Sequence, residues 1–290
     1  MTELRGVFAA AVTPLLAGGA EIDVPGIGHV TDFLVAGGVD GALVCGTAGE
    51  GMALGPPERE RALEAYVAAA GSRIAIMAHC GAQTTADTVR LSAHAAEAGA
   101  VGVSVIAPPY FTLDDRALLA HLVAAAEACA PLPFYIYAFT ARSGYPIPLA
   151  VIEQMRERVS NLVGLKVSEA PWERFEPYLI DGLDIFVGPE ALIAQGLARG
   201  AIGAISALAS ALPEIVVAAV HEGTPEATAF AKTARRTLER YPMPAALKTV
   251  CAHRGVAIGG DVRLPLRALD RDESEALGLA VDGLLASVPA

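Results

Sequence analysis

Lysine is scarce in this chain. Three of the 290 residues are lysines, and arginine supplies the other eighteen of the 21 basic side chains. Acidic residues outnumber the basic ones, and the formal net charge is −11 at pH 7. Such a chain lacks the broad basic surface that attracts nucleic acids and anionic membranes. We therefore expect neither as a partner, although a local cationic site could still bind a small anion.

Cysteine is also rare and follows no pattern. The four cysteines, Cys45, Cys80, Cys129 and Cys251, are scattered, and none are paired at the spacing of a zinc or redox site. We therefore predict no metal site and no disulfide framework. All four are expected to be reduced and to pack in the core as small apolar side chains.

Long apolar runs are missing, although 53% of the residues are hydrophobic. The closest candidate, residues 200–213, is interrupted by glycine and serine and falls short of the roughly 20 residues of a membrane helix. The first residues lack the basic-then-apolar layout of a signal peptide. We expect a soluble, cytoplasmic protein with no membrane partner.

Two kinds of segment alternate along the chain. Short apolar runs rich in β-branched residues predict buried strands, and alanine-rich stretches between them carry apolar residues at helical spacing. The predicted strands are residues 7–12, 41–45, 74–79, 102–106, 134–138, 162–166, 184–188 and 203–206. The clearest predicted helices are 57–70, 85–98 and 114–130.

Eight β-α units in series predict a closed TIM (β/α)8 barrel. We assign the barrel to residues 1–222 and a C-terminal helical extension to 223–290, with helices near 224–240, 245–254 and 273–286. A doubly wound open sheet is the alternative. It more often has fewer strands, and no GxGxxG motif follows the first strand here.

Lys166 stands in an unusual place for a lysine, near the end of the apolar run Leu162-Val163-Gly164-Leu165-Lys166-Val167. Burying an ammonium group is costly, so a buried lysine favours its neutral amine. A neutral amine can condense with a ketone to form a Schiff base. The alternative is that Lys166 ends its strand and reaches water.

Two hydroxyl-bearing residues are predicted to lie near Lys166. Tyr137 ends the strand before that of Lys166, and Thr47 follows the second strand within Gly46-Thr47-Ala48-Gly49-Glu50. The catalytic groups of a barrel lie at the carboxyl ends of its strands, so all three should meet there. A tyrosine with a hydroxyl partner can relay protons. Each of the two, taken alone, favours a structural role, and only their joint placement with Lys166 favours catalysis.

The chain resembles the dihydrodipicolinate synthase / N-acetylneuraminate lyase family of pyruvate-dependent class I aldolases nearly end to end. The segments that carry the resemblance are Gly6-Val7-Phe8 through Thr13-Pro14, Gly46-Thr47-Ala48-Gly49-Glu50, Pro108-Pro109-Tyr110-Phe111, Gly164-Leu165-Lys166, Gly203-Ala204-Ile205-Ser206 and Arg263-Leu264-Pro265-Leu266.

The resemblance implies a role for several residues. Lys166 would form an iminium with pyruvate or another 2-keto acid, and Tyr137 would shuttle protons. Thr47 would connect Tyr137 to Tyr110, lent by the neighbouring subunit in a homotetramer built as a dimer of dimers. The substrate-binding residues would be Ala48, Gly49, Arg142, Gly188 and Ile205. No metal or organic cofactor would be needed, since the Schiff base forms on Lys166.

Departures from the family pattern concern the second substrate. Ala48 lacks the second hydroxyl of the loop motif, and Ala138-Phe139-Thr140 replaces the common Asn-Val-Pro. Arg142 falls where the synthase branch has an arginine that binds the carboxylate of its aldehyde, although a solvated loop arginine is the alternative. Glu50 is expected to brace its loop, and His79 to be a hydrogen-bonded histidine of the barrel interior.

Three functions remain open at this point. The first is condensation of pyruvate with an aldehyde, aspartate semialdehyde among the candidates, or cleavage of a longer 2-keto acid to pyruvate. The second uses the same lysine in a keto-deoxy sugar acid dehydratase or aldolase. The third is a non-catalytic barrel that binds ligands without turnover.

Overall fold

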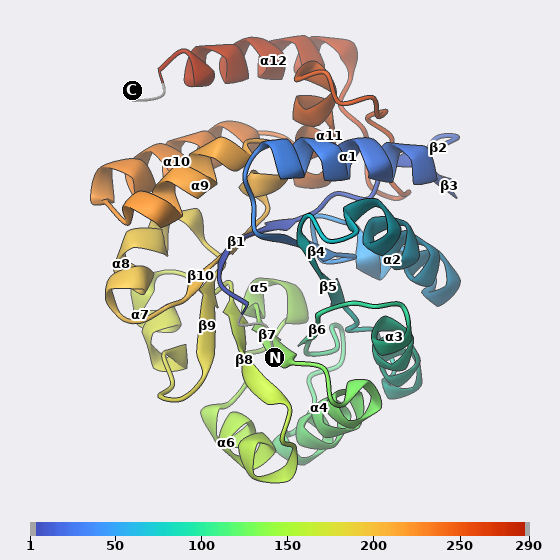
Figure 1. Cartoon of the computed structure of the whole chain (residues 1–290), viewed down its shortest axis with the longest axis vertical. Helices are drawn as coiled ribbons and strands as arrows, with labels where there is room; N and C mark the ends of the chain where they lie inside the picture. Colours follow the sequence, from blue (N-terminus) through green and yellow to red (C-terminus); the bar gives the residue numbers. More distant parts are fainter. Residues whose placement is uncertain (1–3, 288–290) are drawn as a thin grey trace.

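A computed structural model describes residues 4–287 of the chain. Its centre is a closed barrel of eight parallel strands in the order β1-β10-β9-β8-β7-β6-β5-β4 (Figure 1). The strands are β1 Gly6–Ala10, β4 Gly41–Val44, β5 Ala75–His79, β6 Gly102–Ile106, β7 Phe134–Ala138, β8 Leu162–Val167, β9 Asp184–Val187 and β10 Gly203–Ser206. The predicted TIM barrel is confirmed.

Helices surround the barrel and follow the strands in turn (Figure 1). They are α1 Val24–Ala36, α2 Pro56–Ala70, α3 Thr85–Glu97, α4 Asp115–Cys129, α6 Leu149–Arg158, α7 Trp172–Phe175, α8 Ile193–Ala198 and α9 Pro213–Glu222. Side-chain caps mark several helix starts. Thr84 accepts a hydrogen bond from the Asp87 backbone and Asp114 accepts one from that of Ala117, which satisfies otherwise unpaired N–H groups.

Three kinds of short element were not predicted from the sequence. A two-stranded hairpin, β2 Leu15–Leu16 and β3 Glu21–Ile22, precedes α1, and a one-turn helix α5, Thr140–Ser143, follows β7. The 3-10 helices are η1 Gly51–Ala53, η2 Glu176–Tyr178, η3 Glu190–Leu192 and η4 Leu208–Ser210. The first strand ends at Ala10 rather than residue 12, and β4 ends at Val44 because Cys45 turns to a left-handed conformation (φ 57°).

The C-terminal extension consists of α10 Pro225–Leu238, α11 Met243–His253 and α12 Arg271–Leu285. These helices gather on one side of the barrel beside α9 and α1, with α12 outermost (Figure 1). The predicted boundary after residue 222 coincides with the end of α9. Because α10 packs directly on α9 and η3, the division into two domains stays a prediction.

Aromatic rings from alternate strands fill the barrel interior. The ring of Phe186 on β9 lies 5.4 Å from that of Phe8 on β1 and 5.8 Å from that of Tyr135 on β7. One strand separates each of these pairs, so their contacts cross the interior, as in the packed layers of TIM barrels. All four cysteines are free and buried, as predicted. Within residues 4–287, no helix is both long and apolar enough to cross a membrane.

Candidate active site

Lys166 and Tyr137 point into the carboxyl-terminal mouth of the barrel. Tyr137 pairs with Lys166, and Lys166 pairs with Phe186, in the register of β7, β8 and β9. Register partners on neighbouring strands project to the same side of a sheet, and the Phe186 ring lies in the interior. Lys166 and Tyr137 each lie one residue before the end of their strands, so their functional atoms reach the mouth.

The Lys166 amine is buried without a polar partner. Its side chain is 3% exposed, and its Nζ lies 4.1 Å from the centre of the Tyr137 ring. Within the described part of the chain, Lys166 makes no ion pair and no hydrogen bond. The alternative in which it ends its strand and reaches water is therefore wrong. An unpaired amine in an apolar site is available for reaction with a carbonyl group.

The loop after β4 brings Thr47 to Tyr137. The Thr47 Oγ1 and Tyr137 Oη atoms are 3.5 Å apart, a long hydrogen bond. The loop folds back on itself, with Gly51 N donating to Gly46 O, and it is tied to the end of the first strand segment by the Thr13 hydroxyl, which donates to Gly49 O. Gly51 is required there, because a Cβ would lie 1.8 Å from Cys45 O.

The same loop offers backbone donors to the mouth. In residues 4–287 the N–H groups of Thr47 and Ala48 donate no hydrogen bond. Ala48 is buried, so its N–H faces little bulk water. Unpaired buried N–H groups in a glycine-rich turn are suited to hold an anion such as a carboxylate.

Two further predicted residues lie at the carboxyl ends of β9 and β10. Ile205 on β10 is buried and pairs with Phe8. Gly188 directly follows β9, and its N–H donates to Val167 O. A Cβ at Gly188 would lie 2.2 Å from Ser168 Oγ, so close packing of this loop explains the glycine.

Arg142 lies on α5, the turn that follows β7. Its guanidinium carbon is 5.7 Å from the centre of the Phe139 ring, and that ring lies 5.8 Å from the Tyr137 ring. The three side chains therefore form a continuous row from the barrel mouth outward. Arg142 is exposed and carries no ion pair in the part of the chain that the structure covers. It can accept an incoming carboxylate without first losing a partner.

Within one chain, Tyr110 does not lie near the other predicted catalytic residues. Its side chain is 88% exposed, and its ring contacts that of the exposed Phe111 at 4.9 Å. Tyr110 has a positive φ of 81°, an uncommon and strained conformation for a bulky residue. The loop thus holds two adjacent aromatic rings out in solvent.

His79 differs from the expectation of a fully hydrogen-bonded histidine. Its ring packs edge-on against the Tyr137 ring at 5.8 Å, and Nδ1 contacts Cys45 O at 3.1 Å. Nε2, however, is buried without a partner. Burial lowers the pKa of His79 well below its ordinary value, and the charges of Arg59 and Lys166 add to this effect. Its position at the end of the third predicted strand follows from the sequence, whereas this contact with Tyr137 does not.

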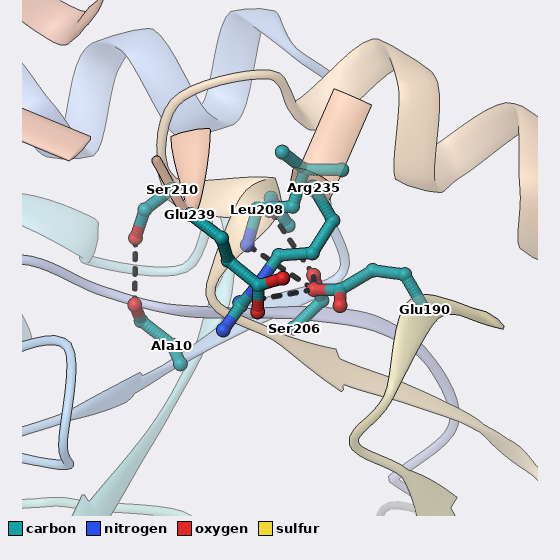
Figure 2. Close-up of polar contacts among 8 residues, drawn as sticks. Ala10, Glu190, Ser206, Leu208, Ser210, Arg235 and Glu239 are labelled. Atoms are coloured by element: carbon teal, nitrogen blue, oxygen red, sulfur yellow. Dashed lines mark hydrogen bonds and ion pairs between the residues drawn. The ribbon is translucent and has the colours of Figure 1, made fainter. Parts of the chain in front are cut away.

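A polar cluster that the sequence does not predict lies beside the site (Figure 2). Glu190 is buried, and its Oε1 accepts from the Ser206 hydroxyl at 2.6 Å and lies 3.6 Å from the Arg235 guanidinium. Burial lowers the pKa of Arg235, but the carboxylates of Glu190 and Glu239 outweigh burial and raise it. This cluster fastens α10 of the extension to the ends of β9 and β10. Arg235 shows no sequence signal, since it lies in an ordinary amphipathic helix.

Comparison with known proteins identifies the family. The model of the dihydrodipicolinate synthetase family matches residues 3–283. The chain belongs to this family. It is 36% identical to an uncharacterised DapA-like lyase of Halobacterium salinarum, over 97% of this chain and 95% of the relative.

Relatives with named activities fall in two branches. An N-acetylneuraminate lyase of Rhizobium meliloti is 31% identical over 98% of this chain and 96% of its own. The crystal structure of dihydrodipicolinate synthase from Aquifex aeolicus superposes with a TM-score of 0.89 at 26% identity, covering 97% of this chain and 98% of that one. This member of the dihydrodipicolinate synthetase family is thus an enzyme of the class I aldolase and lyase type.

No group of three or more metal-binding His, Cys, Asp or Glu side chains occurs among the residues that the structure describes. The groups that the structure brings to the barrel mouth are an amine, two hydroxyls and backbone donors: the Lys166 Nζ, the Tyr137 and Thr47 hydroxyls, and the N–H groups of Thr47 and Ala48.

Proposed function

We propose that this enzyme forms a Schiff base between Lys166 and pyruvate and uses it to condense pyruvate with an aldehyde, or to cleave a longer 2-keto acid in reverse. The observation that carries the proposal is the buried, unpaired Lys166 amine beside Tyr137, whose hydroxyl in turn meets Thr47. An amine and a proton relay are the two groups that a class I aldolase needs.

The proposed reaction begins with attack of the Lys166 Nζ on the C2 ketone of pyruvate. Loss of water then leaves an iminium, which draws electrons from the neighbouring C3–H bond. Removal of a C3 proton gives an enamine, whose C3 attacks the aldehyde carbon to form the new carbon–carbon bond. Tyr137 donates and accepts the protons of these steps. Water finally attacks C2 of the iminium and releases the product from the lysine.

Substrate binding follows from the groups around the amine. The free N–H groups of Thr47 and Ala48 are proposed to hold the pyruvate carboxylate, with Ile205 and Gly188 lining the opposite wall. Gly49 is proposed to take part through its backbone, and its lack of a side chain lets the loop pack against Ala11 O, which would lie 2.8 Å from a Cβ. Ala48 offers its backbone alone, since it lacks the hydroxyl common in the family motif. The Schiff base on Lys166 is proposed to suffice, with no metal or organic cofactor.

The second substrate is proposed to carry a carboxylate, as aspartate semialdehyde does. Arg142 supports this, because its guanidinium is exposed and without an ionic partner in residues 4–287, at the outer end of the row through Phe139 to Tyr137. A planar guanidinium binds a carboxylate through two parallel hydrogen bonds.

Phe139 favours a second candidate, a keto-deoxy sugar acid dehydratase or aldolase that uses the same lysine. An aromatic ring 5.8 Å from Tyr137 replaces the family's common Asn-Val-Pro turn, and the Glu169 carboxylate fixes the next backbone N–H, that of Thr140, at 2.5 Å. Such a change alters the wall that faces the distal part of the substrate. A panel of aldehydes and keto-deoxy sugar acids, assayed for pyruvate consumption and release, separates the two candidates.

The assembly is proposed to be a homotetramer, a dimer of dimers, in which Tyr110 of one subunit completes the relay of its neighbour. The exposed Tyr110-Phe111 pair supports this, because two adjacent exposed rings are typical of interface cores. A cytoplasmic location is consistent with four free, buried thiols.

Borohydride reduction in the presence of pyruvate tests the central step. The reduced protein should gain one pyruvate-derived adduct on the peptide that contains Lys166, and Lys166→Ala should gain none. Absence of the adduct from the folded wild-type protein would contradict the proposal. Measurable turnover that Lys166→Ala abolishes would also exclude a non-catalytic barrel.

A further inference from the structure

A buried ion pair joins the Thr47 loop to the C-terminal extension. The side chains of Glu50 and Lys248 are both 0% exposed, and Lys248 Nζ lies 2.5 Å from Glu50 Oε1. The two residues are 198 positions apart in the chain, one after β4 and the other on α11. Burial lowers the pKa of Lys248, and the contact with Glu50 acts in the opposite direction.

Within residues 4–287, the other side-chain hydrogen bonds of this pair are to the backbone of one short segment. Lys248 Nζ also donates to Asp261 O at 2.6 Å, and Glu50 Oε2 accepts from the Arg263 N–H at 2.7 Å. The Arg263 guanidinium in addition pairs with Glu58 in the first turn of α2. Residues 261–263 of the extension therefore bind both the loop at Glu50 and α2, the helix that follows this loop.

Glu50 belongs to the same turn as Thr47. The Glu50 N–H donates to Thr47 O at 3.2 Å, so Thr47 and Glu50 are the two ends of one turn. Glu50 has a left-handed backbone with a φ of 57°, which is unfavourable for a residue other than glycine unless its surroundings hold it there. The Thr47 hydroxyl at the other end of this turn meets the Tyr137 hydroxyl.

The two buried lysines of the chain have opposite surroundings. Lys166 has no polar partner in residues 4–287, whereas Lys248 has a carboxylate and a carbonyl oxygen. Buried ion pairs contribute little net stability compared with apolar residues of similar volume, because desolvation offsets their attraction. Stability alone therefore does not account for this pair, whereas its directional contacts fix a single geometry for the turn.

We propose that Glu50 and Lys248 are positioning residues that hold the Thr47 hydroxyl in reach of Tyr137. On this view α11 and residues 261–263 are part of the catalytic apparatus, although they contribute no atom that touches substrate. The inference rests on the proposed function, in which Tyr137 relays protons with the help of Thr47.

The test measures proton transfer separately from Schiff-base formation. Exchange of the pyruvate methyl hydrogens in heavy water, followed by NMR, requires both the Lys166 iminium and proton removal. Borohydride trapping of pyruvate reports the iminium alone. In Glu50→Gln and in Lys248→Met, exchange should fall by about 10- to 100-fold, as for other misplaced catalytic groups. The extent of trapping should remain that of the wild type.

A double-mutant cycle shows whether the pair acts through Thr47. Glu50→Gln should slow exchange in the wild type but have no further effect in Thr47→Val. The matched control is Arg254→Met, which removes another ion pair of the same region, the 2.9 Å contact of Arg254 with Glu214 on α9. Arg254 does not contact the Thr47 loop, so exchange should be unchanged in this variant.

Three results would overturn the inference. The first is hydrogen exchange at the wild-type rate in both Glu50→Gln and Lys248→Met. The second is an equal loss of exchange rate from Glu50→Gln with and without the Thr47 hydroxyl. The third is failure of both variants to fold, since the pair would then serve stability. Failure of the proposed function gives a different result, because the wild-type protein itself would then form no pyruvate adduct on Lys166.

Discussion

The amine of Lys166 lies over the face of Tyr137, with Nζ 4.1 Å from the ring centre. The two residues are register partners on β7 and β8, so the backbone hydrogen bonds of the barrel fix their relative positions. Groups held on strands are positioned more rigidly than groups on loops. A cation over an aromatic face is also stabilised by the ring, and the iminium proposed for Lys166 would carry its charge there.

Removal of the Tyr137 hydroxyl should slow proton transfer without preventing formation of the Schiff base. We expect Tyr137→Phe to lower kcat by about 100- to 10,000-fold, the usual contribution of a general acid–base group. The KM for pyruvate should change little, because the ring and the carboxylate donors remain. Steady-state kinetics together with borohydride trapping would measure both effects.

Tyr135→Phe is the matched control for Tyr137→Phe. Tyr135 also points into the barrel, two residues earlier on β7, where its ring packs against Phe186. Thr47→Val should lower kcat less than Tyr137→Phe does. This substitution removes the hydroxyl that lies 3.5 Å from Tyr137 Oη but leaves the Tyr137 hydroxyl itself in place. Equal activity of Tyr137→Phe and Tyr135→Phe would contradict the assignment.

Arg142 should distinguish charged from neutral aldehydes. Hydrogen bonds to charged groups contribute about 1.5–3 kcal/mol, so Arg142→Met should raise the KM for a carboxylate-bearing aldehyde by about 10- to 100-fold. The KM for a neutral aldehyde and the pyruvate adduct should stay unchanged. Arg142→Lys should recover part of the loss, because it restores the charge but not the planar fork. Equal effects on both aldehydes would assign Arg142 to the solvated surface.

The sequence predicted the barrel well because local patterns determine its strands. Each strand is a short apolar run between turn residues, and the run ending at Lys166 was recognised for that reason. Its predicted end differs from the observed one by one residue, as do the ends predicted at residues 45 and 188, and that of the first strand differs by two. Strand ends depend on neighbours in the sheet. The Leu15–Ile22 hairpin was missed, since two-residue strands have no periodicity to detect.

Contacts between residues far apart in the chain could not be predicted from local sequence patterns. Lys248 looks like an ordinary helical lysine until the fold places Glu50 against it from 198 residues away. Arg235 and Glu190 meet only because α10 packs on the ends of β9 and β10. The motifs predicted Lys166, Tyr137 and Thr47, and the structure places these three side chains together. Tyr110 lies exposed and apart from them, and its part in the site stays a prediction.

Acid should destabilise the protein partly through His121. Burial lowers the pKa of this histidine to about 4, and its Nδ1 meets the Thr85 hydroxyl at 2.9 Å. The unfolded chain binds the proton near the ordinary histidine pKa of about 6.5, so it takes up more protons than the folded state between those two values. The free energy of unfolding must therefore fall as the pH drops from about 6.5 towards 4.

Urea unfolding at pH 7 and pH 5 would measure this contribution. From pH 7 to pH 5, the preferential protonation of His121 in the unfolded chain should reduce the free energy of unfolding by at most about 2 kcal/mol. His121→Gln should lose correspondingly less stability between the two pH values than the wild type does. The matched control is His221→Gln, which replaces an exposed histidine at the end of α9. An unchanged pH dependence in His121→Gln would contradict the prediction.

Complementation between two impaired variants would show whether Tyr110 acts across a subunit interface. Lys166→Ala lacks the nucleophile but keeps Tyr110, and Tyr110→Phe lacks the hydroxyl but keeps Lys166. In an isologous dimer each site of a mixed pair takes its lysine from one subunit and its Tyr110 from the other. One of the two sites is then complete, so co-expression should restore activity that neither variant has alone. If Tyr110 instead served its own chain, or no site at all, no mixed dimer would gain a complete site, and the activity would stay at the average of the two variants.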